Sequence, residues 1–148
     1  MRTLSIALLS ILLAASTVVA GFTLKSGMYR MGQLDAAKSE ALSGKKSMAF
    51  LFSDENTLCI QCTVASQQAI ETLAGICVMV YVDKYGAPHL PDTVKSALRS
   101  SEAGTYIPKV VVMSYDLKKV IAIVPFARGE AYRKLLAEAK EKVLSYEK

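Results

Sequence analysis

The sequence is organised around one short stretch, Cys59-Ile60-Gln61-Cys62, in which two residues separate two thiols. Thiols at this spacing can close a small disulfide ring without moving the backbone. The run Met48–Phe52 ahead of the pair is apolar and has the length of a strand, and apolar residues between positions 64 and 73 recur at helical spacing. A cysteine at a strand-to-helix junction meets the unpaired N–H groups and the positive dipole end of the helix, which favours the thiolate. The stretch therefore predicts a reactive thiol at Cys59.

A second feature lies downstream, where Ile107-Pro108 precedes the β-rich run Lys109–Met113. Proline at the mouth of a core strand is unusual, because it cannot donate to the hydrogen-bond ladder. Together the two features resemble the thioredoxin superfamily, in which a Cys-x-x-Cys pair opens a helix and an Ile-Pro with a cis peptide bond packs against it just before the next strand. The resemblance covers about residues 34 to 144. It implies an α/β, thioredoxin-like fold, with a central mixed β-sheet flanked by helices on both faces.

The resemblance also implies roles for four residues. Cys59 would be the nucleophile of thiol–disulfide exchange, and Cys62 the resolving thiol that attacks the mixed disulfide and releases the product. In the oxidised state the two would form a Cys59–Cys62 disulfide. Ile107 and Pro108, the cis-proline candidate, would bind an extended substrate by strand addition. From the residues alone, a Cys-x-x-Cys pair also fits a metal site or a fixed structural disulfide, and most X-Pro bonds are trans.

Several positions depart from the pattern of thioredoxins. The dipeptide between the cysteines is not Gly-Pro, and the chain has no tryptophan. The buried aspartate that helps to move the proton of the second cysteine would fall near Phe50, and its lysine partner near Met79. Asp54 or Glu55 in the following loop can substitute, although solvated loop carboxylates are the commoner reading. We therefore expect slower proton transfer from Cys62 than in thioredoxin.

Two further residues raise the question of a metal site. Cys77 is a third cysteine, either a regulatory thiol or a small buried hydrophobe, and His89 is the only histidine. With the pair they would complete a Cys₃His set, but the second half lacks the tight spacing of structural zinc modules. We predict no metal and no cofactor.

The length and composition indicate one domain. The chain has 148 residues, 52% of them hydrophobic, and a net charge of +5 without a basic stripe, which argues against nucleic acid as a partner.

Residues 1–20 read as a signal peptide, with Arg2 before an apolar run and a small residue, Ala20, at the cleavage point. The alternative is an uncleaved membrane anchor reaching to about residue 24. Either predicts a periplasmic or secreted domain, where dithiols meet an oxidising environment.

Residues 21–33 are predicted to be a short lead segment and residues 34–148 the thioredoxin-like domain. The patterning predicts helices over residues 34–42, 59 to 73 or 74, 92–101 and 130–147, and strands over 47–52, 76–82, 110–114 and 120–124.

The sequence thus predicts a thiol–disulfide oxidoreductase of the cell envelope, which reduces disulfides in protein clients. We expect a monomer that is kept reduced by a membrane electron donor. Oxidase and isomerase remain open, because no motif sets the direction of electron flow. The alternative is a non-catalytic binding module in which the Cys59–Cys62 disulfide is structural.

Overall fold

The computed structural model describes residues 21–146, so the predicted signal peptide lies outside the described residues. The strands within this range are, in chain order, β1 (Tyr29–Arg30), β2 (Met48–Phe52), β3 (Val78–Val82), β4 (Lys109–Met113) and β5 (Val120–Val124). The helices of the same range are α1 (Leu34–Gly44), α2 (Ile60–Leu73), α3 (Asp92–Arg99) and α4 (Glu130–Tyr146), with two short 3-10 turns, η1 (Met31–Gln33) and η2 (Ala87–His89). No helix in the described range is both long enough and apolar enough to cross a membrane.

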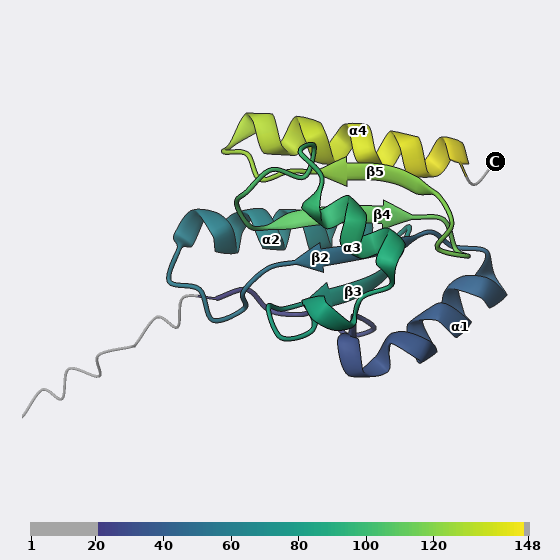
Figure 1. Cartoon of the computed structure of the whole chain (residues 1–148). Coiled ribbons are helices and arrows are strands. Elements are labelled where there is room, and N and C mark those ends of the chain that lie inside the picture. Colours follow the sequence, from purple (N-terminus) through teal and green to yellow (C-terminus); the bar gives the residue numbers. More distant parts are fainter. Residues whose placement is uncertain (1–20, 147–148) are drawn as a thin grey trace, which may run out of the picture.

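The strands form one mixed sheet in the order β1-β3-β2-β4-β5, with β2 at its centre (Figure 1). β2 runs parallel to β3 and antiparallel to β4, and β5 runs antiparallel to β4. Phe52, the last residue of β2, lies opposite Lys109, the first residue of β4. The loop that leaves β2 toward α2 and the segment that enters β4 therefore meet at one end of the sheet.

Successive strand residues point to opposite faces, so each face of the sheet has its own apolar core. The first core lies between the sheet and helices α2 and α4, and the second between the sheet and helices α1 and α3. In β2, Ala49 and Leu51 belong to the first core, whereas Met48 and Phe50 belong to the second. The predicted α/β, thioredoxin-like fold, a mixed sheet with helices on both faces, is confirmed.

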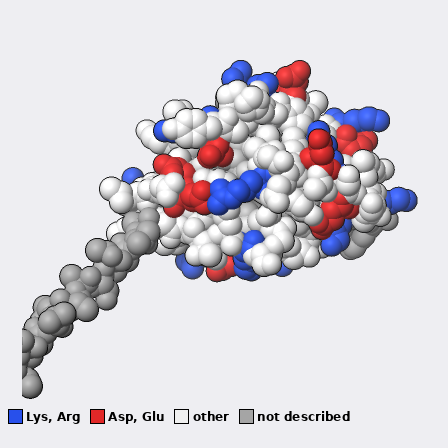
Figure 2. All heavy atoms as spheres, turned by 90° about the horizontal axis from the view of Figure 1, so that it is seen from below, with Lys and Arg blue, Asp and Glu red and all other residues white. Residues whose placement is uncertain are grey.

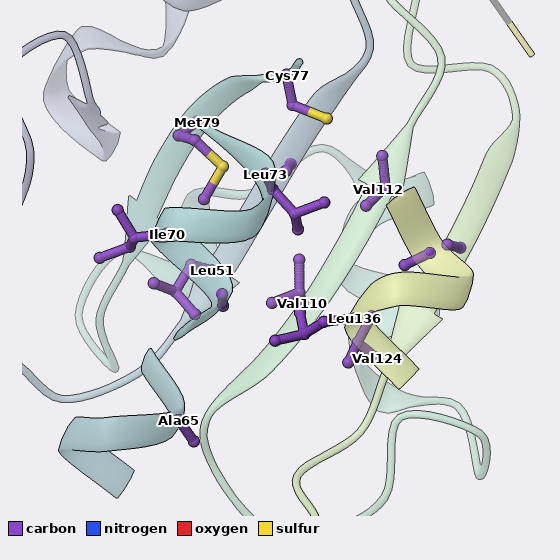
Figure 3. Packing of buried hydrophobic residues seen from close by; sticks show 14 of the residues in the cluster. Leu51, Ala65, Ile70, Leu73, Cys77, Met79, Val110, Val112, Val124 and Leu136 are labelled. Atoms are coloured by element: carbon purple, nitrogen blue, oxygen red, sulfur yellow. The ribbon is translucent and has the colours of Figure 1, made fainter. Parts of the chain in front are cut away.

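The first core holds α2, and with it the cysteine pair, against the sheet. Figure 3 shows Val110 of β4 between the side chains of Leu73 from α2 and Leu136 from α4. All three are buried, with at most 1% of their surface exposed. Burying an aliphatic side chain of this size contributes about 1.5–3 kcal/mol relative to leaving it in water. The helix that carries the cysteines is therefore anchored along its buried face.

The structure differs from the sequence prediction at the lead segment, residues 21–33, where we expected no regular element. Tyr29 and Arg30 form β1, which pairs with β3. Phe22 is 8% exposed and belongs to the first core, where its ring meets that of Tyr81 at 5.8 Å. A strand of two residues is too short to show a periodic pattern, so this element had no sequence signal.

The register of β2 bears on the position that we matched to the buried aspartate of thioredoxins. We placed that position near Phe50, and Phe50 faces α1 and α3, on the side of the sheet away from α2. Its neighbours Ala49 and Leu51 face the α2 layer. Because side chains alternate along a strand, a shift of one residue in such a match moves the position to the other face of the sheet.

Candidate redox site

Cys59 and Cys62 form a disulfide at the start of α2, with a Cα–Cα distance of 5.2 Å. We expected the helix to begin at Cys59; instead Cys59 is its N-cap, with extended backbone angles (φ −77°, ψ 102°). The Cys59 Sγ accepts a hydrogen bond of 3.2 Å from the backbone N–H of Cys62. One N–H group that has no partner inside the helix is thereby satisfied by sulfur. The same N–H and the helix dipole would stabilise a thiolate at Cys59 after reduction.

The two cysteine residues differ in their exposure to solvent. Cys59 is exposed, whereas Cys62 is half-buried. The residues on either side of Cys59 are large, apolar and exposed, with Leu58 at 85% and Ile60 at 74%. An incoming sulfur therefore has open access to Cys59, and it would approach across an apolar surface.

The structure brings Ile107 close to the loop that leads to Cys59. Ile107 lines a hollow of about 330 Å³ together with residues 53–56 of that loop. The peptide bond between Ile107 and Pro108 is cis, Pro108 is buried, and the neighbouring Tyr106 is 74% exposed. All of these residues lie at the end of the sheet where β2 meets β4.

Lys109 anchors the segment that carries Ile107 and Pro108. Its Nζ donates to the backbone carbonyl of Leu98 at 3.2 Å and to that of Gly104 at 2.6 Å. The side chain is buried, and loss of hydration lowers the pKa of Lys109 below its ordinary value of 10.5. The ammonium group of Lys109, at the first residue of β4, thus links the end of α3 to the segment before β4. No sequence pattern marked this lysine.

The β2–α2 loop, residues 53–58, is held by side chains that sequence reasoning missed. Arg30 makes two hydrogen bonds of 2.8 Å to the carboxylate of Glu55. The Tyr81 hydroxyl accepts from the N–H of Glu55 at 2.9 Å and donates to the carbonyl of Ser53 at 3.2 Å. Arg30 lies in a segment without a pattern, and Tyr81 in an apolar strand, so only their position in the fold marks them.

Glu55 is consequently not a solvated loop carboxylate. The guanidinium of Arg30 holds the pKa of Glu55 below its ordinary value of 4.5. A carboxylate that stays ionised and paired at neutral pH is a poor carrier for the proton of Cys62. Burial raises the pKa of Tyr81 above 10, so its hydroxyl also keeps its proton.

Two buried hydroxyl groups meet beneath α2. Ser53 and Ser66 are buried, and their hydroxyl oxygens are 2.7 Å apart. Among residues 21–146, the buried polar or charged side chains are Ser47, Ser53, Ser66, Lys109 and Ser114. This set contains no carboxylate that could take a proton from Cys62.

The structure does not bring the hypothetical zinc ligands together. Cys77 is 6% exposed and belongs to the core beneath α2 and α4. His89 is exposed, in η2, and the neighbouring Ala87 packs against the opposite core. Within residues 21–146, no three histidine, cysteine or acidic side chains are placed to hold a metal ion.

Comparison with known proteins gives matches to solved structures only. No protein-family model and no curated protein sequence matches the chain. One similar structure is described as "DsbH Oxidoreductase", with a TM-score of 0.48 and 19% identity, covering 87% of this chain and 92% of that chain. Another is a disulphide isomerase from Xylella fastidiosa Temecula1, with a TM-score of 0.46 and 15% identity, covering 85% of this chain and 94% of that chain.

Proposed function

We propose that the chain is a thiol–disulfide oxidoreductase acting on protein clients through Cys59 and Cys62. The observation that carries the proposal is the disulfide at the N-terminus of α2, with Cys59 exposed and Cys62 half-buried. In this arrangement a client can reach Cys59, which the helix stabilises as a thiolate, and Cys62 lies one helical turn away. The reaction needs no cofactor, because the pair itself carries two electrons.

In the reducing direction, the Cys59 thiolate attacks a client disulfide. A bond forms between the Cys59 Sγ and one client sulfur, and the other client sulfur leaves as a thiolate and takes up a proton. The Cys62 thiolate then attacks the Cys59 Sγ, which closes the Cys59–Cys62 disulfide and releases the second client thiol. The client gains two electrons, and the protein must be reduced again by a dithiol donor.

The segment that carries Ile107 and Pro108 binds the client. The segment lies beside the β2–α2 loop, and the neighbouring Tyr106 is exposed, as are Leu58 and Ile60 on either side of Cys59. An extended client segment would pair with the backbone at Ile107 and bring its disulfide to Cys59. On the face shown in Figure 2, basic and acidic side chains lie intermixed, so that face has no field of one sign to attract nucleic acid.

We place the protein in the cell envelope, as a monomer that reduces clients with electrons from a membrane donor. The signal-like sequence of residues 1–20 supports export. A non-catalytic binding module with a structural disulfide remains the second candidate. It is favoured by one observation, the lack of a buried carboxylate near Cys62 among residues 21–146.

Trapping of mixed disulfides tests the exchange mechanism. In Cys62→Ser the client stays attached to Cys59, so we expect covalent complexes that separate from the free protein on a non-reducing gel and disappear with dithiothreitol. Cys59→Ser should trap none, because it lacks the attacking thiolate.

Cys77→Ser in the Cys62→Ser background is the matched control. Cys77 is buried, and its removal should leave the trapped complexes unchanged. If Cys62→Ser forms no complex with oxidised clients, the protein does not exchange disulfides, and the binding module becomes the better reading.

A further inference from the structure

The position of Cys59 depends on the β2–α2 loop, which has no regular structure of its own. Such a loop is free to sample many conformations unless other elements hold it. Within the described part of the chain, Tyr81 makes two of the contacts that hold it, one to each of Ser53 and Glu55. Tyr81 itself is 3% exposed and lies in β3, which is fixed between β1 and β2.

Arg30 adds a second support from the neighbouring strand. It lies opposite Tyr81 in the β1–β3 register, and its guanidinium sits 5.5 Å from the centre of the Tyr81 ring. The same guanidinium grips both oxygens of Glu55, an arrangement that fixes orientation as well as distance. Arg30, Tyr81 and Glu55 therefore form one unit, which we call the loop clamp.

The loop clamp is connected to the helix and to the start of the described chain. The hydroxyl of Ser53 meets that of Ser66, one helical turn beyond Cys62 in α2. A Cβ at Gly21 would lie 2.6 Å from the carbonyl oxygen of Glu55, so the backbone there passes against the loop. Contacts therefore hold both the loop before Cys59 and the helix after Cys62.

We propose that Arg30 and Tyr81 are positioning residues, which act through the loop clamp to keep Cys59 at the N-cap of α2. A thiolate gains from the helix only while its sulfur stays within reach of the Cys62 N–H, 3.2 Å away in the oxidised protein. With the clamp removed, Cys59 samples positions away from the N-cap, and its thiolate is less populated at neutral pH. The importance of this effect for turnover rests on the proposed function, but the effect on the sulfur does not.

Tyr81→Phe is the decisive variant, because it removes the hydroxyl and keeps both the ring and the net charge. The full chain is reduced chemically, and the rate of Cys59 alkylation by iodoacetamide is followed against pH by mass spectrometry. We expect the alkylation midpoint to move about 0.5–1 pH unit upward, and the rate at pH 7 to fall about three- to tenfold, since thiolate population sets the rate.

Arg30→Gln should shift the midpoint in the same direction. Part of that shift would be the lost positive charge, which about 1 M NaCl screens, whereas the positional part persists in salt. Lys118→Gln is the matched control, because it also removes a positive charge from an ion pair, 3.7 Å to Asp116 in the β4–β5 turn, at the end of the sheet opposite to the loop. It should leave the midpoint unchanged.

An unchanged alkylation midpoint in Tyr81→Phe, whatever happens to the stability, would overturn the positioning role. The proposed function is tested separately, by equilibrating each protein with glutathione redox buffers. A wild-type protein that fails to exchange with glutathione contradicts the proposed function, while its reduced form still reports on the loop clamp.

Discussion

Glu55 is the residue whose ionisation links the loop clamp to pH. Arg30 lowers the pKa of Glu55 below 4.5, and the nearby Asp83 raises it by a smaller amount. As the pH falls, the unfolded chain takes up this proton first, so the pair stabilises the fold above about pH 4.5 and is lost as the pH falls through the lower pKa of the folded state.

The expected size of this effect is modest, because Arg30 is half-exposed and Glu55 is 29% exposed. Between about pH 5 and pH 3 the wild type should lose about 0.5–1 kcal/mol more free energy of unfolding than Glu55→Gln, as measured by urea titration. About 1 M NaCl should shrink the difference. A variant that loses as much stability as the wild type would show that the pair is not stabilising.

Single residues also show what the sequence could reveal. Cys59 and Cys62 could be found because their spacing is a motif, and Ile107-Pro108 because it precedes a strand. Arg30 and Tyr81 could not, because their importance comes from contacts between β1, β3 and a loop, which residue types alone do not specify. Their roles appear only when the register of the sheet is known.

At the scale of elements, segments with a clear hydrophobic pattern could be predicted, and the two-residue strand β1 could not. α4 and β5 lie where their patterns predicted them, within a residue or so of the expected ends. The boundaries of α2 and β3 moved inward by one or two residues, because caps and strand ends depend on hydrogen bonds rather than on hydrophobic period. β1 was missed, since two residues carry no period.

The segment before β1 nevertheless contributes to the core. Phe22 is buried among side chains of the first core and meets Tyr81 edge to face. Phe22→Ala should therefore lower the free energy of unfolding by about 2–4 kcal/mol, toward the low end of phenylalanine truncations because it lies near the end of the described chain. Chemical denaturation followed by circular dichroism would measure this loss.

Leu42→Ala provides the comparison for Phe22→Ala. Leu42 is 54% exposed in α1, and its truncation should change the stability by less than about 0.5 kcal/mol. Equal losses in the two variants would mean that the segment around Phe22 is not packed on the sheet in solution.

At the scale of the whole molecule, the sheet order brings distant parts of the sequence to one site. β2 lies between β3 and β4, so the loop after β2 meets Tyr81 of β3 on one side and Ile107, just before β4, on the other. The sequence indicated this order only through the resemblance, because periodicity predicts elements and not their neighbours. The departures from thioredoxin could be seen in sequence, but the faces of the sheet on which Phe50 and Leu51 lie required the register.

The direction of electron flow is a property of the whole fold, because it compares the stabilities of the oxidised and reduced proteins. A potential lower in the folded protein than in the unfolded chain means that folding favours the disulfide, and for two electrons each 30 mV corresponds to about 1.4 kcal/mol. For a reductase we expect a potential of about −270 mV. The free energy of unfolding of the oxidised form should then exceed that of the reduced form, by the difference between the folded and unfolded potentials converted at this rate.

Two measurements on one preparation check this expectation: alkylation of the Cys59–Cys62 pair across redox buffers, in native and in denaturing conditions, and urea unfolding of each form. A potential near about −120 to −180 mV, with the reduced form the more stable, would contradict the reducing direction and leave oxidase or isomerase activity. A potential below about −300 mV would identify a structural disulfide and with it the binding module. Because the potentials and the stabilities close one thermodynamic cycle, a disagreement between them would show that reduction changes more of the molecule than the disulfide at the start of α2.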